Sequence, residues 1–178
     1  MNNPQESEDH FKNNDYRTIE QTMEKLSGGT RRLAAQLTTS ASFDSLWNVL
    51  TDYDRLNLNI PNLLSSKKIY QKNNNVHLRQ VGAQDFLGMK FSAEVTIDLF
   101  ENKELGLLKF SLIKGDFRKF EGSWKIQNIK NTSKNSLIYD LTVQGCQWMP
   151  IGMIEKRLKK DLSENLFALE RQAKSSKN

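Results

Sequence analysis

Alternation of apolar and polar residues dominates the middle of the chain. Between Phe91 and Leu99 every second residue is apolar, and the residues between them are polar or charged. The same period of two recurs over 31–39, 108–112, 120–126 and 137–143, and two further strands are expected at 63–71 and 76–81, on either side of a polar turn. Such alternation is typical of strands that have one buried face and one solvated face. Short polar turns separate the segments, so the pattern predicts about seven antiparallel strands, mostly joined as hairpins.

Two regions have a helical period instead. Apolar residues at 43–50 recur every three or four positions directly after Ser42, which predicts a short helix capped by that serine. Residues 51–62 predict a second short helix or turn. After Pro150, apolar residues from Ile154 to Leu169 form one stripe, which predicts a helix of roughly 20 residues, about 30 Å long.

The order of these elements predicts the fold class. An antiparallel sheet has an apolar face that must be covered, and the last helix is the only long one in the pattern. A twisted sheet of about seven strands tends to curl. We therefore expect an α+β helix-grip fold, in which a curved antiparallel sheet surrounds the long C-terminal helix and two short helices follow the first strand. A cavity between sheet and helix is compatible with this arrangement.

The two ends of the chain differ from the middle in their pattern of apolar and polar residues. Residues 1–29 are polar, have no sustained period and end in Ser-Gly-Gly. They predict a disordered tail, with a transient helix at 19–26 as a possible exception. The folded domain is accordingly expected over 30–174, followed by a disordered end at 175–178.

Charge and composition limit the cellular locations and the partners that the sequence favours. The 178 residues carry a formal net charge of +5, with −3 on residues 1–29 and +8 on the rest. A basic surface of this kind could attract nucleic acid or an anionic membrane, or it could simply be solvated. There is no apolar run near the ~20 residues that a membrane span needs, and no apolar leader. With Cys146 as the lone cysteine, we expect a cytoplasmic protein, with contact at an intracellular membrane as an open alternative.

The sequence gives little support for a catalytic site or a metal site. The two histidines, His10 and His77, cannot assemble a zinc site, and no glycine-rich phosphate loop is present. Asp52 and Asp54 are interpreted as turn residues, with general acid/base work as the alternative. No catalytic residue, metal or cofactor is predicted.

Four segments carry a resemblance to a known superfamily: 43–54 (FDSLWNVLTDYD), 60–63 (IPNL), 115–124 (GDFRKFEGSW) and 148–155 (WMPIGMIE). In order and spacing they resemble the START-like superfamily, also called polyketide cyclase/dehydrase-like, over residues 31–172. Within it, the likeness is greatest to the coenzyme Q-binding branch and its cyanobacterial and plastid relatives. The resemblance implies a pocket for a lipid, a quinone or a polycyclic aromatic molecule; in a photosynthetic bacterium this could be plastoquinone or another prenyl lipid.

Candidate pocket residues come from the inward faces of the strands and the last helix. They are Phe91, Val95, Phe110, Phe117, Arg118, Phe120, Trp124, Tyr139, Ile154, Leu158 and Leu162. Rings of this kind could cover a flat ligand, or they could be ordinary core. Arg118 faces inward only if its strand has no bulge, and it would then need a carboxylate or a ligand oxygen. Tyr139 could donate a hydrogen bond to a ligand carbonyl.

The segment before and within the start of the last helix suggests a membrane contact. Its candidates are Trp148, Met149, Met153, Lys156, Arg157 and Lys160. Methionine and tryptophan beside clustered cations suit an anionic lipid surface. The alternative is a buried connection with a solvated basic flank.

The leading hypothesis is a binding protein rather than an enzyme, which carries or presents an apolar ligand near a membrane. Its rival is an aromatase/cyclase acting on a polyketide-like substrate, which needs polar side chains deep in the pocket. The inward faces offer few of these. A nucleic-acid-binding module is not expected, because the chain lacks RNA-recognition motifs.

Overall fold

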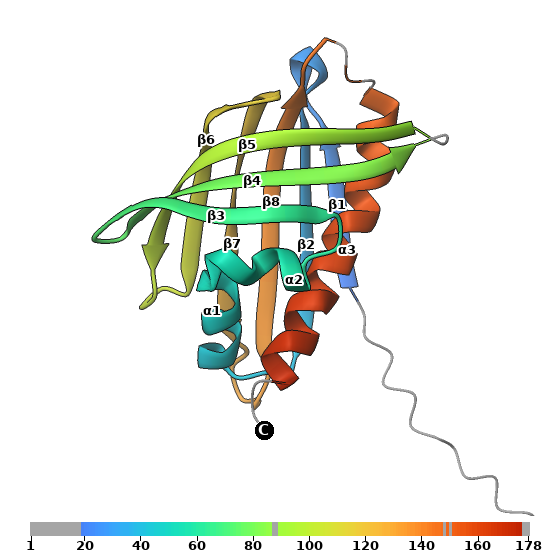
Figure 1. Ribbon diagram of the computed structural model, residues 1–178. Helices are drawn as coiled ribbons and strands as arrows, with labels where there is room; N and C mark the ends of the chain where they lie inside the picture. The colour runs from blue at the N-terminus through green and yellow to red at the C-terminus, as the bar shows by residue number, and fades with distance from the viewer. Residues whose placement is uncertain (1–18, 87–88, 148, 150, 176–178) are drawn as a thin grey trace, which may run out of the picture.

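A curved antiparallel sheet surrounds one long helix in the computed structural model, which describes residues 19–86, 89–147, 149 and 151–175. Side chains are described over the same ranges except at 84–90, 151–154 and 156–157. The sheet has eight strands in the order β1-β2-β8-β7-β6-β5-β4-β3. In Figure 1 strands β3, β4 and β5 cross in front of β7 and β8, and α3 runs along the open side of the curl. The α+β helix-grip fold is confirmed, with one more strand than expected.

Apart from β1, the elements lie where the sequence pattern predicts them, although β4 and α3 are longer than expected. The strands are β1 (Ile19–Lys25), β2 (Arg31–Thr39), β3 (Leu63–Lys72), β4 (Asn75–Phe86), β5 (Met89–Asn102), β6 (Leu107–Gly115), β7 (Phe117–Asn128) and β8 (Asn135–Gly145). The helices are α1 (Phe43–Thr51), α2 (Leu56–Asn59) and α3 (Ile151–Ser175), with single 3-10 turns η1 (Ser27–Gly29) and η2 (Tyr53–Arg55).

The extra strand is β1, and it corrects the expected start of the domain. Residues 19–25 form neither a tail nor a helix, but an edge strand paired with β2 from Ile19 opposite Leu37 to Lys25 opposite Arg31. The partly buried side chains of Ile19 and Met23 pack against the core. The ordered unit therefore begins before Thr30, while residues 1–18 and 176–178 lie outside the described residues.

The short helices form as their sequences predict. The side chain of Ser42 accepts a hydrogen bond from the backbone N–H of Ser45 at 3.2 Å and caps α1. Leu46 and Leu50 on its inner face are buried. Turn η2 and helix α2 then lead to Asn62, whose left-handed backbone (φ 63°) directs the chain into β3.

Helix α3 is held to the sheet at several points along its length. The guanidinium of Arg31 pairs with Glu155 at 2.5 Å near the start of the helix. Near its end, Thr39 donates a hydrogen bond to the buried carboxylate of Glu170 at 2.7 Å. Leu166 between them is fully buried. These contacts fix the distance between helix and sheet, and so the space that lies between them.

Candidate ligand-binding cavity

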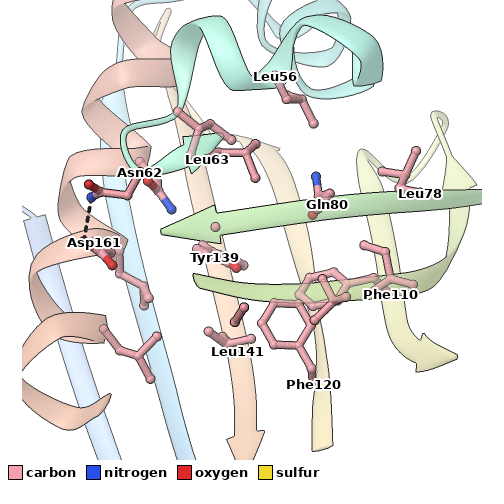
Figure 2. Close-up of a pocket in the computed structure, with 18 of the residues that line it drawn as sticks. Leu56, Asn62, Leu63, Leu78, Gln80, Phe110, Phe120, Tyr139, Leu141 and Asp161 are labelled. Atoms are coloured by element: carbon pink, nitrogen blue, oxygen red, sulfur yellow. Dashed lines mark hydrogen bonds between the residues drawn. The ribbon is translucent and has the colours of Figure 1, made fainter. Parts of the chain in front are cut away.

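A cavity of about 310 Å³ lies between the curved sheet, α3 and the connection from α2 to β3. Most of its wall is apolar and comes from β4–β8 and the inner face of α3. Figure 2 shows Asn62 and Asp161 at one end of the view and Phe110 and Phe120 toward the other. A volume of this size is at the lower end of the range for pockets that enclose small organic ligands.

Aromatic rings from three neighbouring strands form one wall. Trp124 of β7 stacks on Tyr139 of β8, with ring centroids 3.8 Å apart and planes nearly parallel. Phe120 lies 5.6 Å from Phe110 and 5.5 Å from Phe117, both with tilted rings. All five residues line the cavity. Such a wall offers flat, polarisable surfaces to an aromatic or isoprenoid ligand.

The remaining apolar candidates also reach the cavity. Phe91 and Val95 of β5 line it from the sheet, and Leu158 and Leu162 line it from α3. The side chain of Ile154 lies outside the described residues.

Arg118 does not face the cavity, which corrects the expected inward position. Between β7 and β8 the register shifts, because Phe117 pairs with Gly145 and Lys119 pairs with Gln144. Arg118 is the additional residue of this bulge, and its side chain is exposed. The bulge also explains why Phe117 and Phe120, which are three positions apart, both line the cavity.

Only Tyr139 of the polar end of the cavity was predicted from the sequence. This end comprises Asn62, Tyr139, and Asp161 and Asn165 of α3, all of which line the cavity. Asn62 donates a hydrogen bond to the Asp161 carboxylate at 3.3 Å, as the dashed line in Figure 2 marks. Helical spacing could have indicated the two α3 residues, since 158, 161, 162 and 165 share one face of a helix. The apolar stripe predicted only the leucines of this face.

Tyr139 is the most buried of these polar groups, with 7 % of its surface exposed. Burial raises the pKa of its phenol well above the ordinary value, and the nearby Asp161 carboxylate raises this pKa further. The phenol therefore stays protonated at physiological pH and acts as a hydrogen-bond donor.

Two other polar side chains of the lining are already paired. The hydroxyl of Tyr53 donates to Glu101 at 2.5 Å, and burial together with this bond raises the tyrosine pKa far above its usual range. Gln80 donates to the hydroxyl of Ser66 at 3.1 Å. These bonds orient the two side chains and leave the middle of the cavity mainly apolar.

The structure describes only some of the residues that were predicted to contact a membrane. Met149 lines the cavity, and Lys160 is exposed and 3.5 Å from Glu164. Trp148 and the side chains of Met153, Lys156 and Arg157 lie outside the described residues. In the part of the chain that the structure describes, no helix is long and apolar enough to cross a membrane.

The acidic pair interpreted as turn residues has local partners. Asp52 ends α1 and pairs with Arg55 at 2.6 Å. Asp54 accepts a hydrogen bond from the backbone N–H of Lys68 at 2.8 Å. Neither aspartate lines the cavity. Within the described ranges, no group of three or more histidine, cysteine, aspartate or glutamate side chains could hold a metal ion.

Comparison with known proteins identifies the family. The model of the family "Polyketide cyclase / dehydrase and lipid transport" matches residues 39–170, which is most of the chain. The chain belongs to this family. Among proteins with curated functions, none matches the chain.

Solved structures with the same fold include proteins of different activities. A STAR-related lipid transfer protein from Xanthomonas axonopodis is similar with a TM-score of 0.74 and 12% identity, over 88% of this chain and 93% of that one. The Zhui aromatase/cyclase from Streptomyces sp. R1128 gives 0.69 and 14%, over 82% and 94%. A START superfamily protein from Mycobacterium smegmatis gives 0.66 and 18%, over 81% and 97%. At these identities the likeness shows the fold alone.

Proposed function

We propose that this protein carries or presents an apolar ligand in the cavity between its sheet and α3, with a prenylquinone or a similar lipid as the ligand class. The cavity of about 310 Å³ with its mainly apolar wall is the observation that supports this best. The prenylquinone assignment is supported by the resemblance of four segments to the coenzyme Q-binding branch, including its cyanobacterial and plastid type. Binding ranks above cyclisation because most of the lining is apolar.

The volume sets what part of a lipid can be enclosed. A pocket near 310 Å³ suits a ring system with a few attached groups. A long prenyl chain is larger than this, so its outer units would extend beyond the cavity. We therefore propose that the head ring is held against the wall formed by Phe110, Phe120 and Trp124.

Extraction of the purified protein tests whether a ligand is present. Native mass spectrometry of protein purified from its own source should show a bound mass that organic solvent removes, and the extract should contain a prenylquinone or lipid. Apo-protein should then bind a short-chain prenylquinone in a calorimetric titration. A cavity that stays empty, together with no affinity for quinones or lipids, would refute the proposal.

A cavity-filling variant tests where the ligand binds. Ala93 of β5 lines the cavity, so Ala93→Phe should fill part of the space and weaken prenylquinone binding by at least about tenfold. Ser111 of β6 is exposed, and Ser111→Phe is the matched control, which should bind as the unmodified protein does. Equal affinity of both variants would show that the ligand binds elsewhere.

A further inference from the structure

The connection between α2 and β3 forms one wall of the cavity. Its residues 60–63 line the cavity and make a tight turn, in which the backbone N–H of Leu63 donates to the backbone oxygen of Ile60 at 3.4 Å. Pro61 and Asn62 occupy the two central positions, and the positive φ of Asn62 (63°) suits such a turn.

The side chains that flank this turn are large, apolar and exposed. Leu58 of α2 has 73 % of its surface exposed, and Leu64 of β3 has 61 %. Neither of them lines the cavity, so their exposed surface faces solvent. The connection thus has one side toward the cavity and another toward solvent, and its outer leucines gain free energy on transfer to an apolar phase.

No strand pairing closes the seam between this connection and α3. Figure 1 shows the connection beside the helix. The strands β3–β8 are joined by continuous backbone pairing, whereas the seam is bridged by the side chain of Asn62, which donates to Asp161 at 3.3 Å. That distance is long for such a bond. Opening the seam therefore breaks fewer hydrogen bonds than separating two strands does.

A lipid surface fits these leucines better than a protein partner does. Two side chains beside a turn offer much less area than the roughly 800 Å² that each partner buries in a stable protein complex. Insertion into a bilayer needs no such area, because each inserted leucine contributes by itself. The neighbouring charge agrees, because Lys160, which precedes Asp161 in α3, is exposed although it lies 3.5 Å from Glu164.

We propose that the α2–β3 connection inserts into an anionic membrane and that the ligand enters and leaves the cavity beside it. This inference rests on the proposed function and adds the surface at which ligand exchange occurs. Leu58 and Leu64 enter the lipid, while Lys160 contacts the headgroups. The hydrogen bond between Asn62 and Asp161 holds the seam closed in water and opens during exchange.

Labelling at single positions tests the insertion. Cys146 is the lone cysteine, so an environment-sensitive fluorophore can be attached at Leu58→Cys or at Leu105→Cys in a Cys146→Ser background. Leu105, in the turn between β5 and β6, is 62 % exposed and is the matched control. With vesicles of phosphatidylcholine and phosphatidylserine, the emission should shift to the blue at position 58 and stay unchanged at position 105. Equal responses would overturn the proposal.

The two leucines should also account for much of the vesicle affinity. Leu58→Ser with Leu64→Ser should weaken co-sedimentation with these vesicles by about tenfold. Leu105→Ser with Ile113→Ser, at other exposed positions, should have little effect. An unchanged affinity of the first pair would overturn the docking surface. So would a monomer–dimer equilibrium that the first pair abolishes, because the leucines would then bind a second copy of the chain.

Exchange kinetics test the seam. Asn62→Gly removes the bond to Asp161 and keeps the left-handed backbone, and Asn131→Gly in the β7–β8 turn (φ 61°) is the matched control. Uptake of a short-chain prenylquinone from the vesicles should become about fivefold faster in the first variant alone, the factor that one net hydrogen bond supplies. Equal rates in the two variants would overturn the entry route.

The outcomes separate this inference from the proposed function. If the unmodified protein binds a short-chain prenylquinone in solution but does not bind the vesicles, the inference fails and the proposed function stands. If it takes up no prenylquinone in solution or from vesicles, the proposed function fails and the entry route fails with it.

Discussion

At the scale of single residues, Gly122 makes the aromatic wall possible. It lies opposite Phe110 in the pairing of β6 and β7. A side chain at 122 would place its Cβ 2.8 Å from Cζ of Phe110 and in overlap with the backbone oxygen of Asp140. The missing side chain therefore lets the phenylalanine ring cover the strand and face the cavity.

Replacing Gly122 with alanine should destabilise the protein by about 3 kcal/mol, because backbone and a packed ring must both move. The unfolding midpoint in urea measures this loss. Gly82→Ala is the matched control in β4, where the nearest atom to an added Cβ is 3.6 Å away, and it should change stability by less than about 0.5 kcal/mol. Similar losses in both variants would contradict the steric argument.

At the scale of elements, β1 links the sheet to α3. Gln21 donates a hydrogen bond to the backbone oxygen of Lys159 at 2.8 Å. Lys25 lies 3.7 Å from Glu155, the same carboxylate that Arg31 contacts. The hydrogen bond from Arg31 above all, and Lys25 with it, holds the pKa of Glu155 below its ordinary value. Strand β1 thus helps to hold the first half of α3 over the cavity.

Removing the inward side chains of β1 should therefore loosen the edge of the fold. Ile19 and Met23 are partly buried, and Ile19→Ser with Met23→Ser should cost about 2 kcal/mol, near 1 kcal/mol for each half-buried side chain. Hydrogen exchange should also speed up in the first turns of α3. Glu20→Ser with Thr22→Ser changes exposed positions of the same strand and should have little effect. Equal losses in both pairs would argue against the inward packing.

At the scale of the whole molecule, the basic start of α3 bears on where ligand exchange occurs. We propose that Lys156, Arg157 and Lys160, which follow Met149 in the sequence, contact an anionic membrane. Met149 itself lines the cavity. Basic residues near an anionic surface contribute about 1 kcal/mol each. Changing all three to glutamine should weaken binding to phosphatidylserine-containing vesicles by about a hundredfold.

Co-sedimentation with vesicles measures this, and neutral vesicles provide the baseline. The control variant changes Lys67, Lys68 and Lys72 of β3, which removes the same charge from the far edge of the sheet. It should keep most of the binding to the anionic vesicles. Equal losses in the two triple variants would mean that net charge alone governs the attraction.

The sequence by itself determined most of the elements and the fold class, because periods of two and of 3.6 residues are local properties of the chain. Nine of the side chains predicted from the sequence to face the pocket do line the cavity. Pairing between distant segments decided the rest. Ile19 and Met23 form a strand because β2 offers them an edge, and Arg118 is exposed because β7 and β8 differ in register. The polar end of the cavity forms only where β8, α3 and the α2–β3 connection come together. Contacts between segments that are distant in the sequence cannot be predicted from a local pattern.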